Sequence, residues 1–398
     1  MPPLNTFKRS SVAIALSHAI ALPLQAATIT VDSTSDTPSA NICSLRSAII
    51  AANTNAPVDG CVAGDVSGSD TIDLSGLPND STITLNGNEL PTVTTTISLN
   101  GPEQDNLTIS GNNSSRIVSV EEGGDLTVSS LTLSNGSVSG DGGAIWVDEG
   151  NLTINSSSLF NNYAGNHGGG IYARYSSSVS LSNSTVSGNS ADDGGGIFAR
   201  LSSSVSLSNS TVSGNSARLD GGGIYALDSN VSLSNSTVSE NSADDGGGIY
   251  ARGLYRSLPS GGIFEIRLSN VSLSNSIIAN SLGGGDCYER YDGILTFDTA
   301  SIIEDGSCGA TALAGDIGLA PLADNGGPTQ THALLANSPA RNAGIPSTCT
   351  TTDQRGNPRQ EEAFFVPIVA ANKNIAVVDL GGDDACDIGA FEFSASDE

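Results

Sequence analysis

The stretch Val179-Ser-Leu-Ser-Asn-Ser-Thr-Val-Ser-Gly-Asn-Ser-Ala191 decides the fold, because the chain repeats it. The same letters start again at Val205 and, with one change, at Val231, so each copy follows the last by 26 residues. Looser copies start at Leu126 and Leu152, and a further copy starts at Val271 after about 14 inserted residues. A constant period of this length predicts a solenoid of stacked repeats.

The apolar residues of one repeat alternate with Ser or Gly over only a few positions, as in Val179 and Leu181, which is typical of short strands. A second strand follows a glycine run, as in Gly168 to Ala173. Three short strands per repeat cannot bury a face alone, but copies stacked about 4.8 Å apart form a continuous core. We therefore predict an all-β, right-handed parallel β-helix with ~26 residues per rung. A β-propeller would need longer repeats and four strands per blade.

Two features of the sequence support this fold. Asparagines recur at equivalent positions of the repeats. We expect their side-chain amides to stack along the solenoid and their backbone to adopt left-handed turn geometry. These residues are Asn162, Asn189, Asn215 and Asn241. The stretch Ser44–Asn53 has helical spacing of apolar residues, so we expect a short N-terminal capping helix that covers the open end of the β-helix.

The predicted organisation has four parts. Residues 1–26 have a basic start and a short apolar stretch, which favours a cleaved secretory signal peptide over an uncleaved anchor. The other parts are an N-terminal cap with the first rungs (27–100), the β-helix repeats (101–282, with an insertion at 253–266) and an irregular C-terminal region (283–398).

The six cysteines form an even set, as expected for structural disulfides in an exported protein. Fifteen pairings are open, and we expect neighbours to pair: Cys43 with Cys61, Cys287 with Cys308, and Cys349 with Cys386.

The charge balance excludes one class of partner. The 398 residues carry 42 acidic and 15 basic side chains, a formal net charge of −27. Nucleic-acid binding needs clustered Lys and Arg, so we expect no nucleic-acid partner. We also expect a monomer with no membrane anchor in the mature chain.

Three motifs resemble known families of secreted bacterial proteins. Cys43-Ser-Leu-Arg-Ser-Ala-Ile49 resembles the CSLREA domain, although Ser47 stands where that family usually has Glu. Phe160-Asn-Asn and Gly142-Gly-Ala-Ile145 resemble repeats of polymorphic outer-membrane proteins. Residues 321–392, which end in Cys386-Asp-Ile-Gly-Ala-Phe-Glu392, resemble the choice-of-anchor Q domain. The resemblance implies a secreted or surface-exposed protein of a bacterial envelope.

Stacking turns repeated residues into columns. If the repeated Ile points inward, the next residue points outward; this gives an exposed aromatic column of Trp146, Tyr172, Phe198, Tyr225 and Tyr250. Two positions on, the same face carries Arg174, Arg200 and Arg252. Aromatic and charged side chains together suit sugar rings, so we predict that this face binds a ligand. The alternative is that duplication copies the residues and they stack only on one another.

An acidic column precedes the glycines, and Asp193, Asp220 and Asp245 are weak candidates for calcium ligands. Neutralisation of these carboxylates by the arginines is the other interpretation, and we assign no other cofactor. The insertion at 253–266 brings Tyr255 and Arg256, which we interpret as a ligand-binding loop or as a neutral expansion of a turn.

Two functions remain open. The acid pairs recur in every repeat, whereas an active site needs a unique constellation, so we assign no catalytic residue. We predict a secreted, adhesin-like interaction module that binds an extracellular polysaccharide or a surface protein. The alternative is a carbohydrate-active enzyme of the β-helix type, a polysaccharide lyase or a glycoside hydrolase.

Overall fold

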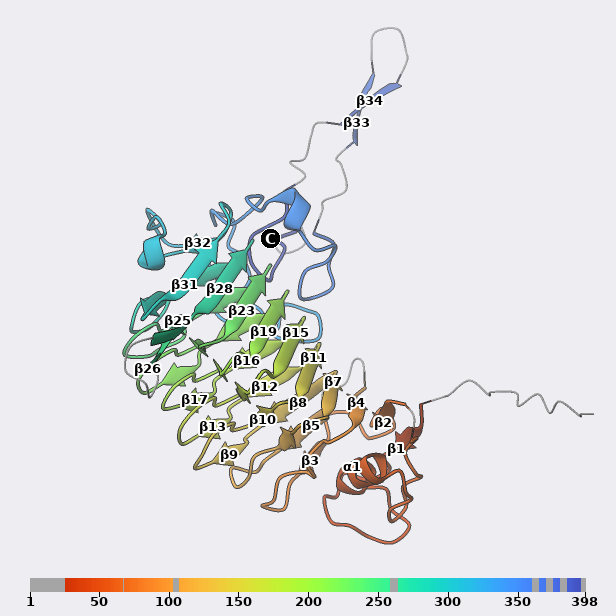
Figure 1. Ribbon diagram of the computed structural model, residues 1–398. Coiled ribbons are helices and arrows are strands. Elements are labelled where there is room, and N and C mark those ends of the chain that lie inside the picture. The colour runs from red at the N-terminus through yellow and green to blue at the C-terminus, as the bar shows by residue number, and fades with distance from the viewer. Residues whose placement is uncertain are drawn as a thin grey trace, which may run out of the picture.

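The computed structural model describes residues 26–66, 68–102, 107–257, 264–359, 365–369, 375–379 and 385–394. Residues 1–25 of the predicted signal peptide lie outside this part of the chain. The described chain winds into a solenoid of parallel strands, with a helix at one end and an irregular C-terminal region beside the later rungs (Figure 1). The predicted parallel β-helix is confirmed.

The rungs form four parallel sheets, which we call A to D in the order in which the chain visits them. Sheet A contains β1 (Thr28–Thr30), β2 (Asp70–Asp73), β4 (Thr96–Asn100), β7 (Asp125–Ser129), β11 (Asn151–Asn155), β15 (Ser178–Ser182), β19 (Ser204–Ser208), β23 (Asn230–Ser234), β28 (Ser269–Ser274) and β31 (Gly293–Phe297). Sheet B contains β3 (Thr82–Thr84), β5 (Leu107–Ser110), β8 (Leu131–Ser134), β12 (Ser158–Phe160), β16 (Thr185–Ser187), β20 (Thr211–Ser213), β24 (Thr237–Ser239), β29 (Ile277–Ala279) and β32 (Ile302–Ile303).

Sheets C and D complete each rung. Sheet C contains β9 (Ser137–Val138), β13 (Tyr163–Ala164), β17 (Ser190–Ala191) and β21 (Ser216–Ala217). Sheet D contains β6 (Val118–Val120), β10 (Ile145–Asp148), β14 (Ile171–Arg174), β18 (Ile197–Arg200), β22 (Ile224–Leu227), β25 (Ile249–Arg252) and β30 (Cys287–Arg290). The expectation of three strands per repeat was therefore wrong for the central rungs. The strands of sheet C are two residues long, too short to show an alternating pattern in the sequence.

One continuous core runs through the solenoid. Equivalent residues of successive repeats pair in register, as Val179 does with Val205 and Ile171 with Ile197. Their side chains are fully or almost fully buried, in a single cluster that extends from Ile29 to Ile303. Each repeat therefore buries its apolar face on its neighbours, as the spacing predicts.

The predicted capping helix is confirmed as α1 (Leu45–Thr54). Ser44 caps it, since its hydroxyl accepts a hydrogen bond from the N–H of Ser47. Leu45 and Ile49 are buried on the first rungs, and the disulfide from Cys43 to Cys61 holds the loop around the helix. No helix in the described ranges is long and apolar enough to cross a membrane.

The predicted stacking of asparagine amides is confirmed. The side-chain N–H of Asn162, Asn189 and Asn215 each donates to the Oδ1 of the next asparagine over 2.9 Å. Their predicted left-handed geometry was wrong, because positive φ angles occur instead at Asn183, Asn209 and Asn235. The stacked asparagines bond to backbone groups inside the solenoid, and this requires no unusual φ angle.

A second polar ladder of serines runs beside the asparagines. The hydroxyl of Ser210 accepts the N–H of Ser184, and the hydroxyl of Ser236 accepts the N–H of Ser210. The same contact continues from Ser236 to Ser276. These hydroxyls satisfy N–H groups at the corner between sheets A and B that the strands leave unpaired.

The solenoid continues for one rung past the expected boundary at residue 282. Strands β30, β31 and β32 pair with β25, β28 and β29 although their sequence no longer repeats. The disulfide between Cys287 and Cys308 closes a loop at this rung.

The C-terminal region then turns back and covers the outer face of sheet B. The hydroxyl of Thr185 donates to the carbonyl of Gln330 (2.6 Å), and that of Thr211 donates to Oε1 of Gln354 (2.7 Å). One rung further, the hydroxyl of Thr237 accepts the N–H of Ala390 (3.0 Å). The outward hydroxyls of three successive rungs thus hold the C-terminal region in place.

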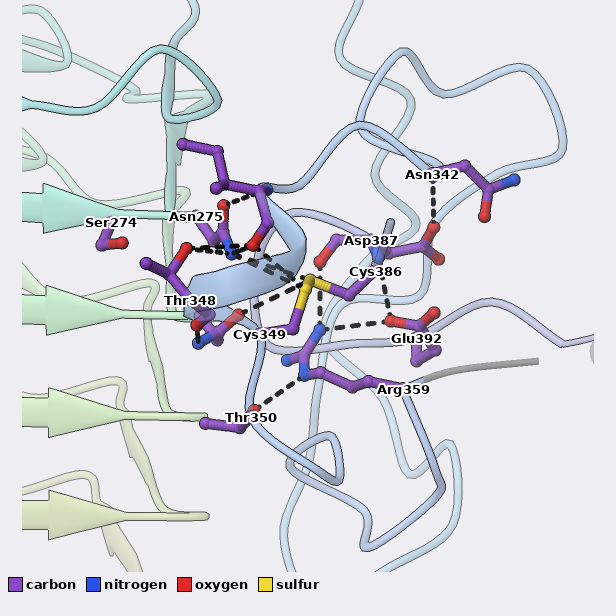
Figure 2. Close-up of a disulfide and its surroundings, with 12 residues drawn as sticks. Ser274, Asn275, Asn342, Thr348, Cys349, Thr350, Arg359, Cys386, Asp387 and Glu392 are labelled. Carbon is purple, nitrogen blue, oxygen red and sulfur yellow. Dashed lines mark hydrogen bonds and ion pairs between the residues drawn. A yellow bond between two sulfur atoms is a disulfide. The ribbon is translucent and has the colours of Figure 1, made fainter. Parts of the chain in front are cut away.

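Buried ionisable and polar side chains surround the disulfide of this C-terminal region (Figure 2). Cys349 bonds to Cys386, so all three predicted pairings are confirmed. Arg359 is fully buried and donates to the carbonyls of Gly389 (2.6 Å) and Asp387 (3.0 Å). It also lies 3.3 Å from the carboxylate of Glu392. Burial, together with the nearby Asp387, raises the pKa of Glu392 to about 8.

Candidate functional site

The predicted aromatic column lies on sheet D, but most of it is buried. Tyr172, Phe198, Tyr225 and Tyr250 form a cluster separate from the main core, and none is more than 3% exposed. Only Trp146 is partly exposed. The expectation of an exposed aromatic ladder was therefore wrong for four of its five members.

The rings pack against one another along the column, since the ring centre of Phe198 lies 5.6 Å from that of Tyr172 and 4.7 Å from that of Tyr225. The glycine turns before the strands lie close beside the same side chains. A Cβ placed on Gly194 would lie 2.8 Å from the Cβ of Phe198, and one on Gly221 would lie 2.8 Å from that of Tyr225. The alternation of side chains along a strand correctly predicted that these aromatic residues point away from the main core. The alternation carries no information about which neighbouring segments bury them.

The arginine column lies on the same outer face. Arg200, Leu227, Arg252 and Arg290 follow one another in register. At the start of the column Arg174 pairs with Asp148 over 2.7 Å. Within the described residues, Arg200, Arg252 and Arg290 form no ion pair with a carboxylate. Tyrosine hydroxyls are their neighbours instead, such as that of Tyr225, 3.4 Å from Arg252.

Exposed tyrosines lie at both ends of the arginine column. Tyr175 and Tyr291 are each 44% exposed, and both have positive φ angles, 53° and 49°. Bulky residues rarely adopt this conformation. The Arg174 guanidinium lies 4.8 Å from the ring centre of Tyr175, and that of Arg290 lies 4.7 Å from that of Tyr291. These are cation–π contacts.

We call this surface the arginine–tyrosine strip. Four rung steps separate its ends, a length of about 19 Å at the usual spacing between strands. It consists of Arg174, Tyr175, Arg200, Arg252, Arg290 and Tyr291. Trp146 and Tyr288 flank it: Arg174 lies 4.9 Å from the Trp146 ring centre, and Tyr288 is 38% exposed. Sequence reasoning identified the three arginines of the repeats. It missed Arg290, Tyr288 and Tyr291, because their rung lacks the repeated sequence. It also missed Tyr175, because the next repeats have Leu201 and Asp228 at that position and no column forms.

The acidic column is partnered by other side chains at its start. His167 takes the place of an aspartate in this column, and its Nδ1 lies 2.7 Å from Oδ1 of Asp141. Its Nε2 lies 3.6 Å from Oδ2 of Asp193. Burial raises the pKa of Asp193, and burial with the charges of Asp193 and Asp245 raises that of Asp220. The described residues contain no group of three or more His, Cys, Asp or Glu placed to hold a metal ion. Calcium binding by Asp193, Asp220 and Asp245 stays the weaker of the two interpretations of this column.

The insertion forms a hairpin directly after the strip residue Arg252. Strand β26 (Leu254–Ser257) pairs antiparallel with β27 (Phe264–Arg267). The side chains of Tyr255 and Arg256 lie outside the described residues, as do residues 258–263. At the base of the hairpin, Arg267 lies 3.3 Å from Asp228.

A groove that lies on the outer face of sheet B was not predicted from the sequence. It lies where the C-terminal region stops covering sheet B, and its volume is about 350 Å³. Phe160, 43% exposed, contributes the apolar part of its lining. The polar lining comes from sheet B and from the C-terminal region: Thr132, Ser158, Ser187, Asp324 and Gln330. The groove joins segments far apart in the sequence, so no local motif marks it.

Comparison with known proteins identifies the class. The family model described as "Right handed beta helix region" matches residues 95–302, more than half of the chain, so this protein belongs to that family. A solved chain described as "Crystal structure of pectate lyase Pel9A" is similar at 13% identity and a TM-score of 0.42, with 92% of this chain and 96% of that chain covered. A similarity at this level carries no argument about function. No curated protein sequence matches the chain.

Proposed function

We propose that this protein is a secreted or cell-surface β-helix that binds an extracellular glycan along the arginine–tyrosine strip, in the manner of an adhesin. The observation that carries the proposal is the strip itself. It places exposed aromatic rings about 19 Å apart on one face, and between them lie Arg200, Arg252 and Arg290, which form no ion pair with a carboxylate among the described residues. Aromatic rings suit the apolar faces of sugars, and guanidinium groups donate to hydroxyl and carboxylate oxygens.

The charge of the strip narrows the class of glycan. The whole chain has a formal net charge of −27, so a row of arginines that form no ion pair with a carboxylate in the described part of the chain is a local exception. Each guanidinium offers five N–H donors and matches carboxylate or sulfate groups. An acidic polysaccharide is therefore the form of extracellular glycan that fits this surface best.

Two features support export. Three disulfides are typical of proteins from oxidising compartments. The N-terminal sequence resembles a signal peptide, and residues 43–49 and 321–392 resemble domains of secreted bacterial proteins. This proposal predicts that the chain isolated from culture medium begins near Ala27, which N-terminal sequencing would test.

The test of glycan binding is an array of neutral and acidic polysaccharides probed with the wild type and a Tyr175→Ala, Tyr291→Ala double variant. We expect the wild type to be retained on acidic glycans and the double variant to lose most of that retention. Tyr163→Ala is the matched control, since Tyr163 is 50% exposed and lies on sheet C, away from the strip. Equal retention of all three proteins would contradict the proposal.

A second candidate function rests on His167. It interrupts the aspartate column, and it lies between a hydrogen-bonded Asp141 and an Asp193 whose pKa burial raises. A histidine that is oriented by one carboxylate and lies 3.6 Å from a second is suited to general acid–base chemistry. The array should therefore also be assayed for new reducing or unsaturated ends. Release that His167→Ala abolishes, with retention unchanged, would make the protein a carbohydrate-active enzyme instead.

A further inference from the structure

The outer face of sheet B carries a ladder of hydroxyl groups, and only those of its later rungs form hydrogen bonds with the C-terminal region. Thr132, Ser158, Thr185, Thr211 and Thr237 are paired in register along successive rungs. The last three bond to the C-terminal region at Gln330, Gln354 and Ala390. Within the described residues, the hydroxyls of Thr132 and Ser158 have no hydrogen-bond partner from the protein.

The groove begins where this covering ends. Thr132 and Ser158 line it, with Ser187 beside them from the next rung. Phe160 lies on the same strand as Ser158, two residues further on, and therefore on the same face. The groove thus combines free hydroxyls with one exposed aromatic ring. Its volume of about 350 Å³ is at the lower end of the range for small-molecule sites.

The far wall of the groove comes from the C-terminal region. It contributes the carboxylate of Asp324 and the amide side chain of Gln330. Neither is a cation, and none of the residues that line the groove is Lys, Arg or His. An anionic ligand would meet the Asp324 carboxylate without compensation, so the chemistry of the groove differs from that of the arginine–tyrosine strip.

We propose that this groove is a separate binding site for a neutral sugar unit, alone or at the end of a short oligosaccharide. The ring of Phe160 would contact the apolar face of the sugar. The hydroxyls of Thr132, Ser158 and Ser187 would exchange hydrogen bonds with those of the sugar. On the opposite wall the Asp324 carboxylate would accept hydrogen bonds, and the Gln330 amide would donate or accept them. The site does not depend on the arginine–tyrosine strip, which lies on sheet D.

The test is titration of the full mature chain with neutral di- to tetrasaccharides built from glucose, galactose or N-acetylglucosamine, followed by calorimetry or ligand-observed NMR. We expect one of these sugars to bind the wild type with a Kd in the millimolar range or tighter. Phe160→Ala should weaken binding by about tenfold, the effect of losing one aromatic contact. Asp324→Asn should weaken it severalfold without loss of thermal stability.

The strip variant Tyr175→Ala, Tyr291→Ala serves as the matched control and should bind the neutral sugar as the wild type does. Failure of every sugar to bind with a Kd of about 10 mM or below would overturn the inference. Binding that Phe160→Ala and Asp324→Asn leave unchanged would overturn it as well. If the wild type is not retained on any acidic glycan of the array but still binds the neutral sugar, the strip proposal alone is rejected.

Discussion

The side-chain N–H of Asn189 donates to Oδ1 of Asn215 over 2.9 Å, and the backbone N–H of Asn189 donates to the same oxygen over 3.0 Å. One buried oxygen thus satisfies two donors from the neighbouring rung. The amide of Asn215 in turn donates to the carbonyl of Val186 and to Asn241. The ladder therefore links consecutive rungs through groups that water cannot reach.

Asn215→Ala should lower the free energy of unfolding by about 3 kcal/mol, because it leaves several buried polar groups without partners. Guanidinium titration measures this change. Asn151→Ala, at an exposed strand position, is the matched control and should cost less than about 0.5 kcal/mol. Equal effects of the two substitutions would show that the ladder does not stabilise the solenoid.

Glu392→Gln should change how stability depends on pH. Its pKa is raised from 4.5 to about 8 in the folded protein, so the neutral carboxyl is favoured there. The stabilisation from this group is complete below about pH 4.5 and is lost as the pH rises through about 8. The variant should match the wild type at pH 4 and be more stable by a few kcal/mol at pH 9.

Thermal unfolding of both proteins between pH 4 and pH 9 measures this difference. Glu122→Gln, at an exposed position, removes the same charge and should show no such trend. A stability difference between Glu392→Gln and wild type that stays constant with pH would contradict the assignment.

Replacing Cys349 and Cys386 together with Ser should destabilise the C-terminal region and leave the solenoid folded. The disulfide spans 37 residues, and closing a loop of that length contributes about 4 kcal/mol through chain entropy. Limited proteolysis with mass spectrometry should show cleavage of the variant after about residue 310, with a stable fragment that retains the repeats. Proteolysis throughout the repeats at the same protease concentration would show that the two parts unfold together.

Chelation should leave the melting temperature unchanged within about 1 °C. His167 contacts Asp141 and Asp193, and Arg218 lies 2.7 Å from Asp192, so these carboxylates have side-chain partners and do not require a metal ion. Differential scanning fluorimetry with EDTA and with added calcium measures this. A rise in melting temperature that saturates with calcium would mean that the acidic column holds a metal ion.

Much of the fold could be predicted because its determinants are local and repeated. The 26-residue period gave the solenoid, the inward columns and the asparagine ladder, since equivalent residues must stack. The capping helix carried its own signal in the spacing of Leu45, Ile49 and Ala52. The pairing of neighbouring cysteines could be predicted because each such disulfide closes its own local loop.

The candidate sites could be predicted only in part, because exposure depends on contacts between segments. The burial of Phe198 comes with its ring contacts to Tyr172 and Tyr225 and the close approach of the turn at Gly194, and an alternating pattern shows none of these contacts. The covering of sheet B by residues such as Gln354, and the groove at its edge, join positions more than 140 residues apart. No local pattern records such a contact.

The central claim is that the arginine–tyrosine strip binds an extracellular glycan. The most direct measurement is calorimetric titration of an array-selected acidic oligosaccharide into the wild type and into an Arg200→Gln, Arg252→Gln double variant. Arg218→Gln, an exposed arginine off the strip, is the control. The account predicts at least tenfold weaker binding by the double variant and less than twofold change in the control. Unchanged affinity of the double variant would contradict it.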